Sequence, residues 1–125
     1  MTVQGIELVY LYVDDLEGAI RFYEAALGLR FSRFEDWADC RLAGGTRFGL
    51  HGSHAGAEPQ TPGTAIVDFL VDDLAAATER VRAVGATVGA VQEVPVGRFV
   101  EFRDPQGYRV QLFERARTDR PGPSP

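Results

Sequence analysis

The chain contains one stretch of sequence twice, once in each half. Residues 13–28 read VDDLEGAIRFYEAALG, and residues 71–85 read VDDLAAATERVRAVG. Both open with Val-Asp-Asp-Leu, continue with a helical pattern and close on a glycine. An internal repeat of this kind predicts two copies of one structural unit that pack against each other to form a shared core.

The sequence on either side of these stretches repeats as well. A strand pattern precedes each, at residues 8–13 and 65–71. Three further strand-like segments follow each, at 29–34, 37–42 and 46–51 in the first half and at 87–91, 98–103 and 108–114 in the second. WADCR at 37–41 matches FVEFR at 99–103, and GTRFGL at 45–50 matches GYRVQL at 107–112. Each half is therefore predicted to be β-α-β-β-β.

Short polar and glycine motifs mark where these elements begin and end. Asp14 or Asp15, and Asp72 or Asp73, can accept hydrogen bonds from the free N–H groups of a first helical turn. Gly28 and Gly85 suit left-handed helix ends. Gly44-Gly45 and the segment 104–107 are predicted turns between strands.

These patterns predict an α+β fold in which two βαβββ modules form a curved mixed sheet around a cavity. Residues 1–115 form one domain, with module one at 5–51, a linker at 52–63 and module two at 64–115. The linker is rich in small residues, Gly and Pro, and the proline-bearing tail at 116–125 is expected to be disordered.

The composition is that of a globular domain and limits the classes of partner. The chain has 125 residues, 45% of them hydrophobic and 25% charged, and a net charge of −5. An acidic chain is a poor match for nucleic acids or anionic membranes. We expect no membrane span, no signal peptide and, with Cys40 as the single cysteine, a reducing cytoplasmic setting. The strand pattern buries Cys40 as an inert thiol.

Two motifs carry a family resemblance that spans roughly residues 5–115. VDDLEGAIRFYEAALGL at 13–29 and DPQGYRVQLFE at 104–114 resemble the vicinal oxygen chelate superfamily, which includes glyoxalase I, extradiol dioxygenases, fosfomycin-resistance enzymes and bleomycin-resistance proteins. The resemblance implies two half-barrels around a cavity that holds a divalent metal in many members. For a chain this short it also implies a homodimer that exchanges modules. The linker length permits pairing within a chain or across a dimer.

The residues at the family's metal positions predict that no metal cofactor is bound. The resemblance places these ligands at Leu8, Gly49, Ile66 and Gln111, of which three have no coordinating side chain and the fourth is an amide. Catalytic divalent sites need several His or carboxylate ligands. The alternative is a shifted site of His51, Asp68 and Glu101, while His51 and His54 can also be ordinary solvated residues.

Strand alternation predicts which side chains face the cavity. Val9, Leu11 and Val13 should face the helices and their neighbours the cavity. The predicted ligand-binding residues are Tyr10, Tyr12, Trp37, Gly49, Asp68, Phe99, Glu101, Arg109 and Gln111. Large aromatic rings with a few charges suit a planar, partly apolar ligand.

Structural interpretations of the same residues stay open. The tyrosines and Trp37 can serve packing alone, and Asp68 can pair with Arg109. Glu101, Arg41, Arg103 and Asp39 match across the repeat, which favours ion pairs that stabilise the sheet.

Two functions follow, and the residues leave open whether binding is followed by a reaction. The first is a metal-free small-molecule binding protein, similar to the bleomycin-resistance branch, that sequesters an antibiotic or related aromatic compound. The second is a lyase or isomerase that uses Asp68 or Glu101 as general base, with His51 as a further catalytic candidate.

Overall fold

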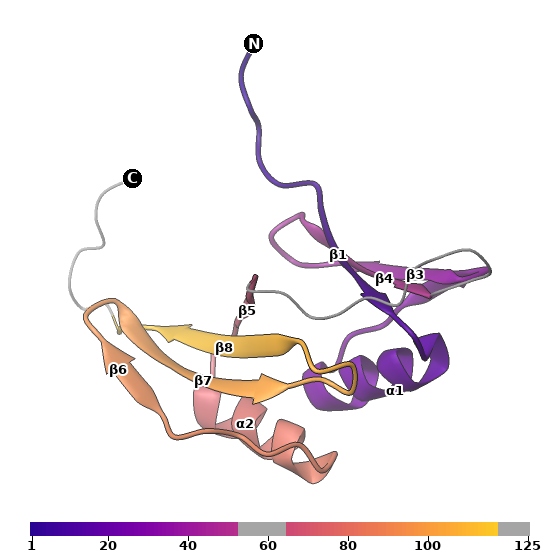
Figure 1. Ribbon diagram of the computed structural model, residues 1–125. Coiled ribbons are helices and arrows are strands. Elements are labelled where there is room, and N and C mark those ends of the chain that lie inside the picture. Colours follow the sequence, from indigo (N-terminus) through magenta and orange to yellow (C-terminus); the bar gives the residue numbers. More distant parts are fainter. Residues whose placement is uncertain (53–64, 118–125) are drawn as a thin grey trace.

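The chain folds into two similar α+β modules, seen in a computed structural model that describes residues 1–52 and 65–117 (Figure 1). Apart from residues 52, 116 and 117, the predicted linker and tail lie outside the described residues, and Gly52 itself ends a strand. The first module comprises β1 (Leu8–Val13), α1 (Leu16–Leu27), β2 (Ser32–Phe34), β3 (Trp37–Arg41) and β4 (Arg47–Gly52). The second comprises β5 (Val67–Leu70), α2 (Leu74–Ala83), β6 (Gln92–Val94), β7 (Gly97–Arg103) and β8 (Arg109–Arg115).

Each module has one mixed four-stranded sheet with the same strand order. The first sheet runs β1-β4-β3-β2 and the second β5-β8-β7-β6. β1 pairs with β4, and β5 with β8, in parallel, whereas the other pairs are antiparallel. The predicted α+β class and the repeated βαβββ order are confirmed.

The helices begin where the repeated aspartates predict. The carboxylate of Asp15 accepts a hydrogen bond from the backbone N–H of Gly18, and Asp73 does the same for Ala76. Gly28 ends α1 with a left-handed φ of 71°. No helix in residues 1–52 and 65–117 has the length and apolar character to span a membrane.

The strand predicted at residues 87–91 is wrong, because the corresponding strand is β6, at Gln92–Val94. β6 pairs with β7 through a tight turn in which Val94 lies opposite Gly97. That short turn fixes the paired residues next to it, so the Thr87–Val91 segment runs outside the ladder. Within this segment the backbone N–H of Gly89 donates a hydrogen bond to the carbonyl oxygen of Glu101 in β7, at 3.0 Å.

The helices cover one face of the sheets and form the core there. Of the three β1 residues predicted to face the helices, Val13 is buried in this core and Leu11 packs against it, whereas Val9 is half-buried and not part of it. Tyr23 of α1 and Phe48 of β4 are fully buried within it. Cys40 is buried as expected, and burial raises the pKa of its thiol.

The two modules pack against each other within one chain, along a boundary that we call the seam. Tyr23 Oη donates to Asp104 Oδ2 at 2.6 Å, in a buried contact. Asp14 and Gln106 exchange two hydrogen bonds, of 2.8 and 3.0 Å. Tyr108 Oη donates to the carbonyl oxygen of Tyr12 at 2.8 Å. We call these contacts the latch. They join the turn at 104–108 of the second module to residues 12–23 of the first module.

Candidate functional site

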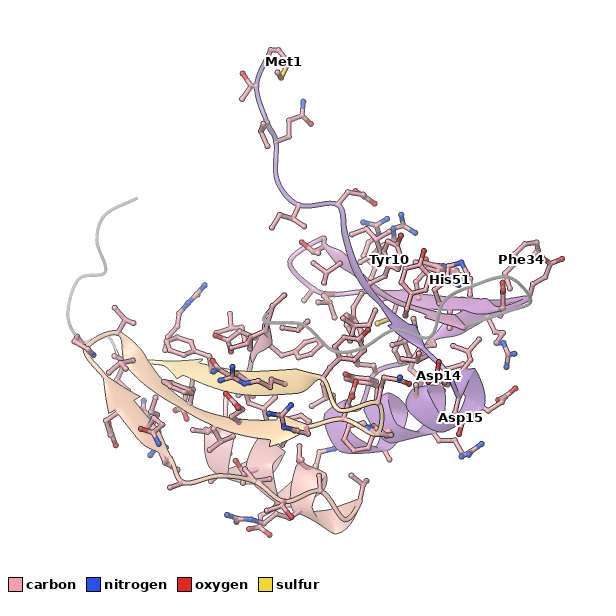
Figure 2. All side chains as sticks on the ribbon, in the orientation of Figure 1. Met1, Tyr10, Asp14, Asp15, Phe34 and His51 are labelled. Atoms are coloured by element: carbon pink, nitrogen blue, oxygen red, sulfur yellow. The ribbon has the colours of Figure 1, made fainter. Side chains whose placement is uncertain are left out.

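A row of rings crosses the first sheet on the face turned away from α1. In the strand register Phe34 lies opposite Trp37, Trp37 opposite His51, and His51 opposite Tyr12. The ring centroids of Trp37 and His51 are 5.8 Å apart, and those of Tyr12 and His51 5.0 Å. Figure 2 shows His51 and Phe34 at this sheet, away from the helix. We call this row, together with Tyr10, the aromatic face.

Trp37 occupies the space that a side chain at position 49 would fill. A Cβ atom on Gly49 would lie 2.5 Å from Cη2 of Trp37 and 3.2 Å from Cβ of Tyr10. The Trp37 Nε1–H donates to Asp39 Oδ2 at 3.0 Å, which holds the indole in place. Tyr10 packs edge-on against Trp37 and Tyr12 and is 42% exposed. Glycine at this position therefore creates the seat for the indole.

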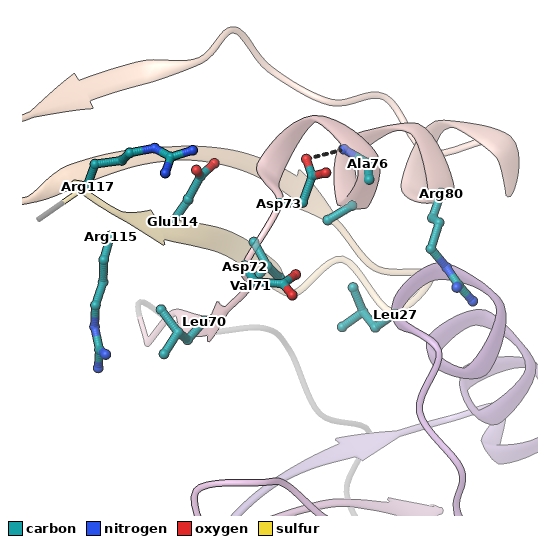
Figure 3. A pocket seen from close by; sticks show the side chains of 11 residues that line it. Leu27, Leu70, Val71, Asp72, Asp73, Ala76, Arg80, Glu114, Arg115 and Arg117 are labelled. Atoms are coloured by element: carbon teal, nitrogen blue, oxygen red, sulfur yellow. Dashed lines mark hydrogen bonds between the residues drawn. The ribbon is translucent and has the colours of Figure 1, made fainter.

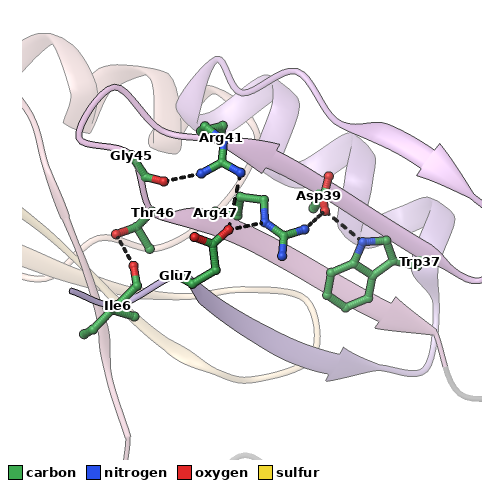
Figure 4. A network of polar contacts seen from close by, with 8 residues as sticks. All are labelled: Ile6, Glu7, Trp37, Asp39, Arg41, Gly45, Thr46 and Arg47. Atoms are coloured by element: carbon green, nitrogen blue, oxygen red, sulfur yellow. Dashed lines mark hydrogen bonds and ion pairs between the residues drawn. The ribbon is translucent and has the colours of Figure 1, made fainter. Parts of the chain in front are cut away.

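Charged residues beside the aromatic face are paired with one another. Arg47 bridges Asp39 at 2.7 Å and Glu7 at 3.0 Å (Figure 4). The hydrogen bond from Arg47, followed by that from Arg41, lowers the pKa of Glu7. These groups hold β1, β3 and β4 together and orient the indole through Asp39.

The second sheet repeats this pairing. Arg109 donates two hydrogen bonds to Glu101, of 2.9 and 3.0 Å, and Gln111 Nε2 adds a third at 3.1 Å. The hydrogen bond from Arg109 is the main cause of a lowered pKa of Glu101. Asp39 and Glu101 form ion pairs as predicted, but their partners are Arg47 and Arg109 and not Arg41 and Arg103. Arg103 instead donates to the turn carbonyl of Gly107, at 2.8 Å.

Asp68 has no such partner. The proposed pair with Arg109 is wrong, because Arg109 is engaged with Glu101. Within residues 1–52 and 65–117, the side chain of Asp68 makes no hydrogen bond or ion pair. Partial desolvation is the cause of its raised pKa. Asp68 lies on an exposed position of β5, at the rim of a cavity of about 570 Å³ on the seam.

The sequence-predicted site residues thus fall into three places. Tyr10, Tyr12, Trp37 and Gly49 come together on the first sheet, and Glu101, Arg109 and Gln111 on the second. Phe99 lies opposite Phe113 in the β7–β8 ladder, and Asp68 stands apart at the seam. Sequence reasoning missed Phe34, which is 72% exposed at the edge of the aromatic face. The sequence signal that could have found it is the two-residue gap between Phe34 and Trp37, which suits a tight turn that sets the two side chains opposite each other.

Two cavities open near the seam, and neither includes the rings of Tyr10, Tyr12 or Trp37. One is the cavity beside Asp68, and the other, of about 770 Å³, lies next to α2 (Figure 3). Tyr10 and Phe34 are 42% and 72% exposed, so the aromatic face is open to solvent at these two rings.

A comparison with protein families matches residues 5–112 to the Glyoxalase/Bleomycin resistance protein/Dioxygenase superfamily. The chain belongs to this superfamily. The match covers both modules and agrees with the repeat that the sequence shows.

Several solved structures share this fold. A glyoxylase/bleomycin resistance protein/dioxygenase domain from Frankia sp. EAN1pec is 25% identical, with a TM-score of 0.75 over 91% of this chain and 99% of that one. TnmS3, an antibiotic binding protein from Streptomyces sp. CB03234, is 23% identical, with a TM-score of 0.75 over 93% and 99%. Lactoylglutathione lyase from Agrobacterium tumefaciens is 23% identical, with a TM-score of 0.72 over 90% and 95%. A comparison with curated proteins gives no match.

The residues of this superfamily member do not fit a divalent metal at the positions that the resemblance implies. Leu8 and Ile66 offer no donor atom, the space beside Gly49 is filled by indole, and Gln111 is hydrogen-bonded to Glu101. In the described part of the chain no three His, Cys, Asp or Glu side chains converge on a point. His51 lies on the first sheet, whereas Asp68 and Glu101 lie on the second. The donor set therefore supports no metal-dependent step.

Proposed function

We propose that this protein binds a small aromatic, antibiotic-like molecule on its aromatic face, and that it does so without a metal cofactor. The observation that carries the proposal is the indole of Trp37 seated over Gly49, at a position where metal-dependent relatives are expected to present a ligand. The indole of Trp37 occupies the space beside position 49 that a metal-coordinating side chain would need.

The geometry of the cluster suits stacking. Aromatic pairs gain about 0.5–1.5 kcal/mol beyond the burial of their surface when rings meet edge-on or offset. Tyr10 remains 42% exposed, so one ring is available to a ligand without any rearrangement. Trp37 is fixed through Asp39 and Arg47, so little side-chain entropy is lost when a ligand stacks against it.

A homodimer completes the proposed site. The aromatic face is open in one chain, whereas small-molecule sites bury most of their ligand. Phe34, which is 72% exposed at the edge of the aromatic face, adds apolar surface there. A second copy that packs over this face would enclose the ligand between two aromatic walls. Light scattering of the purified chain, expected to give twice the monomer mass, measures this.

The binding experiment uses the single tryptophan as its probe. Titration of the protein with planar aromatic compounds, in EDTA-containing buffer, should quench or shift the emission of Trp37 and raise the melting temperature. Trp37→Leu should weaken binding at least fivefold, as measured by calorimetry, because one stacking contact of about 1 kcal/mol is lost. Val96→Ser, which removes an exposed apolar side chain in the β6–β7 turn, is the matched control and should bind normally.

Two results would contradict the proposal. One is tight binding that requires an added divalent metal and disappears in EDTA. The other is binding that Trp37→Leu leaves unchanged, since a ligand on the aromatic face must sense the loss of the indole.

A second candidate function is a lyase or isomerase reaction, and one observation favours it. Glu101 is held by Arg109 and Gln111, which lower its pKa and make it a poor base. Asp68 has no partner among the described residues, and its pKa is raised. A general base needs a free carboxylate of raised pKa. Conversion of a bound ligand by the wild type but not by Asp68→Asn, with binding retained in both, would establish the enzyme.

A further inference from the structure

The seam has two ends that the repeat makes equivalent. At one end the turn at 104–108 of the second module meets the end of β1 and the start of α1. At the other end the turn at 42–46 of the first module lines one cavity together with β5 and with Ala77 and Arg80 of α2. The turns share their backbone form, since Gly45 and Gly107 have φ values of 102° and 99°.

One end is closed by side chains that the other end lacks. The latch uses Asp104, Gln106 and Tyr108. In the aligned repeat, the corresponding residues are Leu42, Gly44 and Thr46. None of these three donates a side-chain hydrogen bond across the seam. Thr46 Oγ1 donates instead to the carbonyl oxygen of Ile6 in its own module, at 2.9 Å (Figure 4). Asp72 is the equivalent of Asp14 in the repeat. Its side chain makes no hydrogen bond or ion pair with described residues.

The missing side chains leave a cavity. The space of about 570 Å³ lies between the turn at 42–46 and β5, and it reaches the C-terminal end of α1 and, at Ala77 and Arg80, the middle of α2. Its walls are mostly apolar, with Leu27, Leu42, Phe48, Phe69 and Val71 among them. Cavities of about 300–1,000 Å³ with apolar walls and a few polar groups are typical small-molecule sites. The larger depression in Figure 3 shares Leu27, Val71 and other residues with this space, and forms its approach beside α2.

Three charged residues line this cavity: Arg47, Arg80 and Asp68. Arg47 is neutralised by Asp39 and Glu7. Arg80 donates to the carbonyl oxygen of Ala25, at the C-terminal end of α1, where a cation offsets the helix dipole. Asp68 has no counter-charge among the described residues, and no cation contributes to the shift of its pKa. An ammonium group is the partner that such a carboxylate accepts.

We infer that the open end of the seam is a second small-molecule site, for a compound with an apolar body and one ammonium group that pairs with Asp68. The site is separate from the aromatic face, since its lining residues do not include Tyr10, Tyr12 or Trp37. It exists because the first module's turn carries glycine and threonine where the second carries glutamine and tyrosine.

The test compares two probes of the same shape by NMR titration of ¹⁵N-labelled protein. The 2-phenylethylammonium ion should shift the amide signals of Gly44 and of residues 66–70, and should bind at least tenfold more tightly than neutral 2-phenylethanol. Asp68→Asn should reduce the affinity for the ammonium probe to that for the alcohol. Glu93→Gln removes the same charge from an exposed position of β6 and should bind like the wild type.

A second variant rebuilds the latch. Gly44→Gln together with Thr46→Tyr copies the closed end into the open one, and a Cβ atom at Gly44 would have no heavy atom within 4 Å. This variant should keep its melting temperature and lose binding of the ammonium probe. If the variant fails to fold, Gly44→Gln alone should still weaken binding.

Three outcomes would overturn the inference: equal affinity for the two probes, shifts confined to the aromatic face, or conversion of a dimer to monomers by the rebuilt latch. The last would show that a second copy occupies the seam. Because Trp37 emission reports the aromatic face and the Gly44 amide reports the seam, failure of one site leaves the other testable.

Discussion

Gly49→Ala tests whether the missing side chain at position 49 sets the orientation of Trp37. A Cβ atom there would lie 2.5 Å from Cη2 and 2.6 Å from Cζ2 of the indole. Carbon atoms in contact prefer about 3.5–4.0 Å, so the ring must move by roughly 1 Å. The hydrogen bond from Trp37 Nε1 to Asp39 Oδ2 is 3.0 Å long, so a shift of this size away from Asp39 would break it.

Gly49→Ala should lower the free energy of unfolding for two reasons. Overpacking of this kind typically destabilises by about 1–3 kcal/mol, and the lost hydrogen bond adds about 1 kcal/mol. We expect the free energy of unfolding to fall by about 1–3 kcal/mol, because the indole lies partly on the surface and can relax outward. Affinity for a stacked aromatic ligand should fall about fivefold, which corresponds to roughly 1 kcal/mol.

The assay is direct because Trp37 is the only tryptophan in the chain. Its emission maximum reports the position of the indole, urea denaturation gives the stability, and calorimetry gives the affinity. Gly44→Ala is the matched control, since a Cβ atom there meets no heavy atom within 4 Å. Unchanged emission and affinity in Gly49→Ala would refute the claim that glycine seats the indole.

Three further predictions concern the latch, the ion pairs and metal content. Tyr23→Phe leaves the buried Asp104 carboxylate without its 2.6 Å donor and should cost about 1–3 kcal/mol in urea denaturation; a loss below about 0.5 kcal/mol would show that the latch is dispensable. Because Arg109 lowers the pKa of Glu101 in the folded state, the pair stabilises above the unfolded-state pKa, and this contribution is lost as the pH falls through the folded-state pKa. Arg109→Gln should therefore be less stable than the wild type at neutral pH and approach it in acid, and a difference that grows in acid would contradict this. Protein purified without chelator should contain no stoichiometric divalent metal by elemental analysis, and EDTA should leave its melting temperature unchanged.

The fold was predictable because its signals are local and occur twice. The capping aspartates, the glycine after α1 and the alternation along β1 each depend on a few neighbouring residues. The repeat strengthens these predictions, because the same motif occurs at the same position in both halves of the chain. β6 was misplaced because its position depends on the turn to β7 and not on its own weak pattern.

The candidate site was only partly predictable. Alternation brought Tyr10, Tyr12 and Trp37 to one face, because side chains on alternate positions of paired strands must share a side. It could not give the partner of Arg109 or the isolation of Asp68, which depend on side-chain geometry between strands. It also could not reveal the unequal ends of the seam, which need the packing of both modules.

The latch can form only late during synthesis of the chain. Its contacts join residues that lie 81, 92 and 96 positions apart in the chain. At ribosomal speeds of about 5–20 residues per second, Asp104 emerges roughly 4–16 s after Tyr23. Until then the Tyr23 hydroxyl of α1 has no Asp104 carboxylate to donate to, and only the side of α1 that meets its own sheet can be covered. The first module thus waits for the last quarter of the chain, and that interval is when a chaperone would matter most.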